Sequence, residues 1–336
     1  MKQAMFQEAK EGGKVLCSLC SHRCLIAEGK RGICAVRENR GGVLYSLVYD
    51  KVIAQNIDPI EKKPLFHFLP GSRSYSIATP GCNFRCLHCQ NADISQLPRD
   101  HGGTLLGEDV PPARIVDAAR TAGCASISYT YTEPTIYFEL AYDTARLAAE
   151  ARLKNVFVTN GYITAEALAV IKPFLHAANI DLKGFTDEFY KKVCGARLQH
   201  VLDAIRLYKQ DGIWIEITTL VIPGHNDSET ELRQIAEFIK SLGDDVPWHV
   251  SRYHPTYKLS DRPITPLETL KRAREIGLDA GLRYVYEGNV PGEGEDTACP
   301  GCRKTLIKRI GFRVLENSVK NGACPHCGRA IAGVWS

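Results

Sequence analysis

Residues 75–91 read YSIATPGCNFRCLHCQN, a short apolar run followed by three cysteines, Cys82, Cys86 and Cys89, in a CxxxCxxC spacing. Cysteines grouped at short spacings in a reducing compartment are typical of metal ligands rather than of disulfides. Three thiolates suit a cubane iron–sulfur cluster better than tetrahedral zinc, because one of the four irons then stays open to another ligand. The stretch therefore predicts a [4Fe-4S] centre directly after a β-strand.

Around this stretch, short β-type runs alternate with helical patterns. This rhythm is typical of a parallel sheet wound with helices. Strands are predicted at 75–78, 126–131, 155–159, 178–182, 213–222, 248–251 and 282–286, and helices at 112–122, 134–152, 164–175, 198–210, 228–242 and 266–276. About six βα units result, which predicts an α/β fold with a full or partial (β/α) barrel.

The length of the chain indicates one large domain with small satellites. Its 336 residues, 44% of them hydrophobic, can bury one sizeable core plus appendages. We expect a Cys-rich metal-binding segment at 1–70, a barrel at 71–289 and a zinc-ribbon-like module at 290–336. A linker rich in Gly and acidic residues is predicted at 288–296.

Charge and hydropathy limit the classes of partner and location. A net charge of +4 without a basic block does not indicate a nucleic-acid or membrane surface. The first twenty residues lack the apolar core of a signal peptide, and no run of 18 apolar residues follows. We therefore expect a cytoplasmic protein whose thirteen cysteines mainly bind metals.

Polar clusters follow the predicted strands, where (β/α) barrels carry their chemistry. They read TYTEPT from Thr130, TNGY from Thr159, DLKG from Asp181 and PGHND from Pro223. Together with the cysteine triplet, they resemble the radical S-adenosylmethionine (SAM) superfamily. The resemblance is closest to glycyl-radical activating enzymes, such as the pyruvate formate-lyase activating enzymes, and to their AmmeMemoRadiSam subgroup.

The resemblance implies an enzyme that uses a [4Fe-4S] cluster, SAM and an external low-potential electron donor. In such enzymes one electron splits SAM into methionine and a 5′-deoxyadenosyl radical, which abstracts hydrogen from a substrate. The subgroup name also implies partnership with Memo-like and AMMECR-like proteins. The sequence does not identify the substrate, because one barrel architecture serves unrelated chemistries.

The resemblance also implies residues that bind the cofactor. The backbone near Tyr131 and Thr132, with Glu133, would bind the SAM amino group, and Lys183 would contact its carboxylate. The remaining implied residues are Thr159, Asn160, Asp181 and His254. Three of these residues also have a plainer interpretation: Glu133 as a charge at a helix N-terminus, Lys183 as a surface lysine and His254 as a packed histidine.

Two positions depart from the activating enzymes. His88 stands where the superfamily usually has an aromatic residue near the adenine, although an imidazole can also stack. Val158 stands where the activases have an aspartate that ligates a monovalent cation, and it offers no side-chain oxygen. The missing cation ligand at Val158 and the added C-terminal zinc-ribbon-like module count mildly against a true glycyl-radical activase.

Two further groups of cysteines flank the barrel. Cys299, Cys302, Cys324 and Cys327 form paired CxxC knuckles, which predict a closed tetrahedral zinc site, with a rubredoxin-like iron or a docking surface as alternatives. Cys17, Cys20, Cys24 and Cys34 are less regularly spaced. Zinc is the first assignment there and an auxiliary iron–sulfur cluster the alternative, because the number of cysteines does not separate the two.

Three functions are therefore weighed. The first is a radical SAM enzyme acting on an unidentified substrate, the second is a glycyl-radical-enzyme activase, and the third is a zinc-stabilised binding or scaffolding protein without turnover. The lone cysteines Cys124 and Cys194 are predicted to be small core residues.

Overall fold

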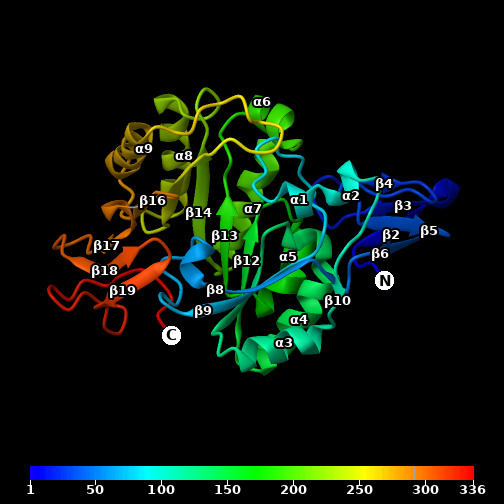
Figure 1. Ribbon diagram of the computed structural model, residues 1–336, viewed down its shortest axis with the longest axis horizontal. Helices are drawn as coiled ribbons and strands as arrows, with labels where there is room; N and C mark the ends of the chain where they lie inside the picture. The colour runs from blue at the N-terminus through cyan, green and yellow to red at the C-terminus, as the bar shows by residue number, and fades with distance from the viewer. Residues whose placement is uncertain (291) are drawn as a thin grey trace.

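The computed structural model describes residues 1–290 and 292–336, and Pro291 of the predicted linker lies outside them. A central eight-stranded sheet runs in the order β16-β15-β14-β13-β12-β11-β9-β8 (Figure 1). Its members are β8 (Ala54–Pro59), β9 (Arg73–Ala78), β11 (Ser126–Tyr129), β12 (Lys154–Thr159), β13 (Ala177–Asp181), β14 (Trp214–Val221), β15 (Trp248–Arg252) and β16 (Val285–Gly288). All neighbours pair in parallel except β8, which is antiparallel to β9. Within the described residues β8 and β16 do not pair, so the barrel is partial.

Helices connect the parallel strands, as the alternation predicted. They are α3 (Pro112–Thr121), α4 (Phe138–Glu150), α5 (Ala165–Ile171), α7 (Leu198–Gln210), α8 (Glu229–Leu242) and α9 (Leu267–Asp279). Figure 1 shows α3 and α4 near one end of the sheet and α8 and α9 near the other. Side-chain caps define two starts: Thr164 accepts from the N–H of Ala167 ahead of α5, and Ser228 accepts from the N–H of Glu231 ahead of α8.

The ends of several predicted elements differ from the structure, and two of these differences have an identifiable cause. The strand predicted at 126–131 ends at Tyr129, because Tyr131 has a φ of 61° that an extended strand does not allow. The helix predicted at 164–175 ends at Ile171 and continues as a 3₁₀ turn, because Pro173 cannot donate a helical hydrogen bond. The helix predicted at 134–152 begins as a 3₁₀ turn, η3 (Pro134–Tyr137).

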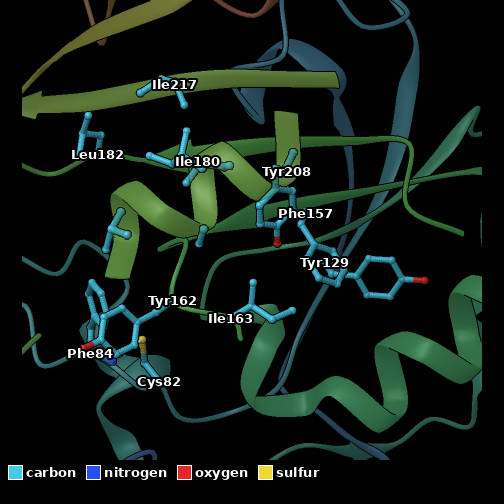
Figure 2. Close-up of a cluster of buried hydrophobic side chains, with 14 of the residues drawn as sticks. Cys82, Phe84, Tyr129, Phe157, Tyr162, Ile163, Ile180, Leu182, Tyr208 and Ile217 are labelled. Carbon is cyan, nitrogen blue, oxygen red and sulfur yellow. Dashed lines mark hydrogen bonds between the residues drawn. The ribbon is translucent and has the colours of Figure 1, made fainter. Parts of the chain in front are cut away.

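The apolar core extends to the cysteine loop. Figure 2 shows Phe84 and Tyr162 beside Cys82, within the same set of buried side chains as Tyr129, Phe157 and Ile180. The rings of Phe84 and Tyr162 meet edge to face, with centroids 5.0 Å apart. Aromatic and apolar packing therefore helps to hold the cysteine loop in place.

The N-terminal residues form two small antiparallel sheets. One contains β1 (Lys2–Gln3), β6 (Val43–Ser46) and β5 (Arg37–Arg40), and the other contains β2 (Gln7–Lys10), β3 (Lys14–Cys17) and β4 (Leu25–Ile26). Arg37 on β5 makes a buried two-pronged ion pair with Glu139 on α4, with N···O distances of 2.9 and 3.1 Å. This pair ties the N-terminal segment to the barrel.

The C-terminal residues form a third antiparallel sheet of β17 (Thr297–Ala298), β18 (Thr305–Ile310) and β19 (Arg313–Asn317). His67 connects this module to the barrel, because its two ring nitrogens lie 2.7 Å from the Ala332 carbonyl and 2.6 Å from the Tyr286 hydroxyl. Among the helices of the described ranges, none has both the length and the apolar character needed to cross a membrane.

Candidate active site at the carboxyl ends of the strands

The loop after β9 carries Cys82, Cys86 and Cys89, and backbone contacts fix its course. The N–H groups of Arg85 and Leu87 donate to the carbonyls of Cys194 and Val193, at 2.8 and 2.9 Å. Those two carbonyls belong to a single π-helical turn, η5 (Tyr190–Cys194). The loop is thus pinned to a segment more than 100 residues away in sequence.

Cys82 and Cys86 are buried and Cys89 is partly buried, and the sulfurs of Cys82 and Cys89 have hydrogen-bond partners. Cys82 accepts from the N–H of Phe84 and from the side-chain amide of Asn160, both at 3.4 Å, and the hydroxyl of Ser95 lies 3.1 Å from the sulfur of Cys89. Burial raises the pKa of the Cys82 thiol well above its ordinary value. A bound metal would supply the positive charge that stabilises these sulfurs as thiolates.

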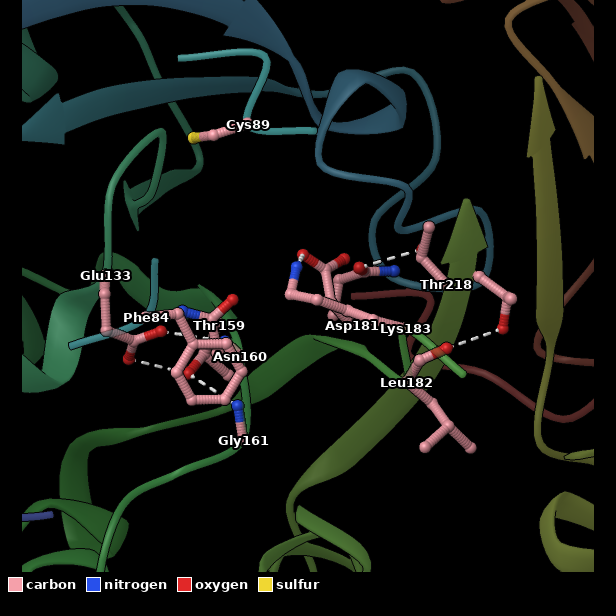
Figure 3. Close-up of polar contacts among 12 residues, drawn as sticks. Phe84, Cys89, Glu133, Thr159, Asn160, Gly161, Asp181, Leu182, Lys183 and Thr218 are labelled. Atoms are coloured by element: carbon pink, nitrogen blue, oxygen red, sulfur yellow. Dashed lines mark hydrogen bonds and ion pairs between the residues drawn. The ribbon is translucent and has the colours of Figure 1, made fainter. Parts of the chain in front are cut away.

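All three cysteines line one cavity of ≈ 470 Å³ at the carboxyl ends of the strands. Its walls include Thr130–Thr132, Val158–Asn160, Asp181 and Lys183. In Figure 3, Cys89 lies on one side of this space, Thr159 and Asn160 lie at the end of β12, and Asp181 and Lys183 lie at the end of β13. The structure thus brings most of the predicted cofactor-binding residues together with the predicted cluster ligands.

Lys183 and Asp181 form an ion pair, with 2.7 Å between Nζ and Oδ2. Burial favours the neutral amine of Lys183, but Asp181 and the nearby thiols outweigh it and hold the pKa of Lys183 above its usual value. The ammonium group of Lys183 therefore lies at the cavity, where its charge suits an anionic group such as a carboxylate.

Glu133 is occupied by partners within the protein. Its Oε1 accepts from the N–H of Thr135 at 3.0 Å and from the hydroxyls of Thr135 and Thr159 at 2.6 and 2.8 Å. Its Oε2 accepts from the N–H of Asn160 at 2.7 Å. The side chain is fully buried and is not among the described residues that line the cavity. It fixes the end of β12 against the start of η3.

Several known proteins and one family resemble this chain over the residues that form the site. The model of the radical SAM superfamily matches residues 76–239. An uncharacterized protein of Methanocaldococcus jannaschii is 49% identical over 98% of this chain and 99% of its own length. A pyruvate formate-lyase-activating enzyme of Clostridium pasteurianum is 22% identical over 65% of this chain and 93% of its own.

The chain belongs to the radical SAM superfamily. It is therefore an enzyme of a class that uses a [4Fe-4S] cluster, SAM and an external electron donor, and the cysteine loop and cavity fit that cofactor pair. Among solved structures, a radical SAM methyltransferase from Sphaerobacter thermophilus has the same fold with a TM-score of 0.51 and 16% identity, covering 66% of this chain and 68% of that one.

His88 and His254, the two histidines considered as SAM contacts, differ in burial and in their place relative to the cavity. His88 is buried, lines the cavity and stacks on Phe189, with ring centroids 6.1 Å apart. Burial lowers the pKa of His88 to about 3, so the ring is neutral at physiological pH. His254 is exposed and does not belong to the described cavity lining.

Cationic residues on one wall of the cavity were not predicted from the sequence. Lys62, at the end of the 3₁₀ turn η2 (Ile60–Lys62), and the adjacent Lys63 line the cavity, and their ammonium groups lie 2.9 and 2.7 Å from the carboxylate of Asp58. The ammonium group of Lys63 also lies 4.5 Å from the centroid of the Tyr131 ring. Burial lowers the pKa of Lys63 to about 8. Two lysines against one aspartate leave this wall positively charged.

Two further neighbours of the site come from distant parts of the sequence. Cys194, predicted as a core residue, is buried, and its sulfur lies within 4.8 Å of ligand atoms of Cys86 and His88. Phe312, from the β18–β19 turn of the C-terminal module, lines the cavity while 43% exposed. No local motif marks either residue as part of the site.

The two flanking cysteine groups differ in geometry. Cys299, Cys302, Cys324 and Cys327 converge so that their sulfurs all lie within 4.8 Å of one another, with pairs at 3.5 and 3.7 Å. Cys17, Cys20, Cys24 and Cys34 instead surround a separate small cavity. The C-terminal group has the arrangement of a single-ion tetrahedral site.

Proposed function

We propose that this chain catalyses the reductive cleavage of SAM to methionine and a 5′-deoxyadenosyl radical, which then abstracts hydrogen from a substrate. The observation that carries the proposal is that Cys82, Cys86 and Cys89 open onto the same ≈ 470 Å³ cavity as the polar strand ends. Cys82, Cys86 and Cys89 would hold a [4Fe-4S] cluster with one iron open to SAM, and this cluster, once reduced by an external donor, would supply the electron that breaks the carbon–sulfur bond.

The positions of the strand-end residues support a specific orientation of SAM. We assign its carboxylate to Lys183, whose charge is held by Asp181. We assign its amino group to the backbone around Tyr131 and Thr132, which line the cavity near the cluster loop. Glu133 supports these positions indirectly, through its hydrogen bonds to Thr159 and Asn160.

The substrate site is assigned to the side of the cavity formed by Lys62, Lys63 and Phe312. The positive wall suits an anionic portion of the substrate, because an ion pair there would be partly desolvated. Ile310 and Phe312 are 64% and 43% exposed at the turn of the C-terminal module. Such an apolar rim suits a macromolecular substrate.

The second candidate is activation of a glycyl-radical enzyme by hydrogen abstraction from a protein glycine. The likeness to the activating enzyme of Clostridium pasteurianum and the apolar rim at Phe312 favour it. Val158 lines the cavity where the activases are expected to hold a cation, and its hydrocarbon side chain disfavours that cation. We therefore rank it below an AmmeMemoRadiSam-type enzyme working in the cytoplasm with Memo-like and AMMECR-like partners.

Zinc is assigned to the C-terminal module. The separations of 3.5 and 3.7 Å between its paired sulfurs are close to the value of about 3.8 Å that follows from tetrahedral zinc with Zn–S bonds of about 2.3 Å. Four protein ligands leave no open position, which gives the ion a structural role. A module this small gains its folding free energy largely from such an ion.

Anaerobic reconstitution with iron and sulfide, followed by SAM and dithionite, tests the proposal. The wild-type chain should form 5′-deoxyadenosine and methionine in equal amounts, and the Cys86→Ala variant should form neither. Cys124→Ala is the matched control, because Cys124 is buried and does not belong to the described cavity lining. An intact cluster that yields no 5′-deoxyadenosine would favour the zinc-stabilised scaffolding protein instead.

A further inference from the structure

The four N-terminal cysteines share one site. Cys17, Cys20, Cys24 and Cys34 line a cavity of ≈ 20 Å³, together with the apolar side chains of Leu19, Ile26, Ile33 and Ile136. The cavity is large enough to hold a water-sized group. His22 and Arg37 complete its lining, and Cys20 and Cys24 are only partly buried. Four sulfurs around one partly buried space are a ligand set for a metal centre.

The spacing of these sulfurs does not match one zinc ion. Around tetrahedral zinc, with Zn–S bonds of about 2.3 Å, the sulfurs lie about 3.8 Å apart and leave no room for a water-sized group. The C-terminal cysteines meet that condition. No three of the four N-terminal sulfurs, all in described residues, lie within 4.8 Å of one another. The same holds for Cys82, Cys86 and Cys89, the expected ligands of a cubane cluster.

The N-terminal site directly adjoins the catalytic cysteine loop. The ring of His22, between Cys20 and Cys24 in the sequence, makes a 2.8 Å hydrogen bond with the carbonyl of Asn83. The guanidinium of Arg99 donates to the carbonyls of Ile33 and Cys82, at 2.8 and 3.4 Å. The backbone segments that carry the two groups of cysteines are therefore joined by single hydrogen-bonded side chains.

Gly81 shows how close this approach is. A Cβ atom at Gly81 would lie 3.1 Å from the carbonyl oxygen of Cys34 and 2.6 Å from Cγ1 of Val36. Its φ of 102° also favours glycine. The chain beside Cys82 thus packs against the chain at Cys34 without an intervening side chain.

We infer that Cys17, Cys20, Cys24 and Cys34 hold a second iron–sulfur cluster, which passes single electrons to the cluster of Cys82, Cys86 and Cys89. An external low-potential protein donor, of the flavodoxin or ferredoxin class, reduces the N-terminal cluster by one electron. That electron moves to the catalytic cluster, and the N-terminal cluster returns to its oxidised state. The electron is consumed when the carbon–sulfur bond of SAM breaks. Only this relay step rests on the proposed function, because the ligation is independent of it.

The ligation is tested by counting metals in a chain without the catalytic cluster. The triple variant Cys82→Ala/Cys86→Ala/Cys89→Ala is purified anaerobically and analysed for iron, sulfide and zinc. We expect about four irons, four sulfides and one zinc per chain. About two zincs with no iron would overturn the inference and leave a structural zinc in its place. This result does not depend on SAM cleavage, so it separates the inference from the proposed function.

The relay is tested by changing the electron donor. In the Cys20→Ala/Cys34→Ala variant, cleavage of SAM driven by a flavodoxin should be largely lost, while cleavage driven by dithionite, which is small enough to reach the catalytic cluster, should persist. Cys124→Ala should keep both rates. Equal retention with both donors would refute the relay. If the variant does not fold, electron paramagnetic resonance of the reduced wild-type chain tests the relay instead. Two reduced clusters close enough to exchange electrons should give two interacting signals, and one isolated signal would refute the relay.

Discussion

Replacing Glu133 with glutamine separates a positioning role from direct contact with SAM. Three of the four hydrogen bonds that Glu133 accepts go to Oε1, and a glutamine oxygen in that place would keep them. The fourth joins Oε2 to the N–H of Asn160 at 2.7 Å. In the Glu133→Gln variant an amide N–H₂ would face that N–H, so two donors would oppose each other in a fully buried site.

The expected loss of stability in Glu133→Gln follows from the lost hydrogen bond and the unpaired donors. A hydrogen bond to a charged group contributes about 1.5–3 kcal/mol, and a buried donor without a partner costs about 1–3 kcal/mol. We therefore expect Glu133→Gln to lower the free energy of unfolding by about 3 kcal/mol, which corresponds to a fall in Tm of roughly 6–12 °C in a domain of this size. Loss of bound iron should accompany it, because Asn160 also donates to the sulfur of Cys82.

The assay is thermal unfolding of the anaerobic protein, with iron content and the KM for SAM measured on the same samples. Glu166→Gln is the matched control, because Glu166 pairs with Arg23 at the surface, where such a change alters stability by at most about 0.5 kcal/mol. An unchanged Tm with a raised KM for SAM would refute the reasoning. That result would show that the carboxylate contacts SAM instead of positioning β12.

Three further predictions concern the attached modules. Burial lowers the pKa of His67 from 6.5 to about 4, so between these pH values only the unfolded chain takes up a proton on this ring. The free energy of unfolding, measured by chemical denaturation at each pH, should therefore be highest above pH 6.5 and fall by up to about 3 kcal/mol as the pH drops to 4. The His67→Phe variant should lose this pH dependence. Glu139→Gln should cost about 3–5 kcal/mol in the same assay, because Arg37 would stay buried without its counter-charge, and a loss below about 1 kcal/mol would contradict the buried ion pair. Cys299→Ser should remove zinc from the C-terminal module and leave the iron content unchanged in elemental analysis, and a matching loss of iron would contradict the zinc assignment.

The fold was predictable from the sequence because its signal is local. Each parallel strand is a short apolar run bounded by polar or turn residues, and several helices have their own start signal, such as Ser228 ahead of α8. The cysteine spacing is a local signal too, and the structure places Cys82, Cys86 and Cys89 around one cavity. The antiparallel edge strand β8 was missed because its burial is uneven along its length, with exposed residues at Asn56 and Ile57.

The rest of the site depends on contacts between residues far apart in the sequence. Lys63 and Phe312 line the cavity, and Cys194 lies close to Cys86 and His88. These three residues come from separate segments, and nothing in their immediate sequence neighbours indicates a place at the site. Glu133 has the sequence signature of a cofactor ligand, yet two of its four donors, the hydroxyl of Thr159 and the N–H of Asn160, become apparent only when β12 is placed beside it. For the N-terminal cysteines, sequence spacing gives the number of candidate ligands, whereas the inference of a cluster depends on the three-dimensional finding that no three of these sulfurs lie within 4.8 Å of one another.

The central claim is that Cys82, Cys86 and Cys89 hold a cluster with one iron open to SAM. Electron–nuclear double resonance on the anaerobically reduced protein, with SAM labelled by nitrogen-15 in its amino group, tests it most directly. The wild-type chain should show a nitrogen coupling to the reduced cluster, and the triple alanine variant should show none. A wild-type chain that binds SAM in equilibrium dialysis but shows no nitrogen coupling would contradict the account.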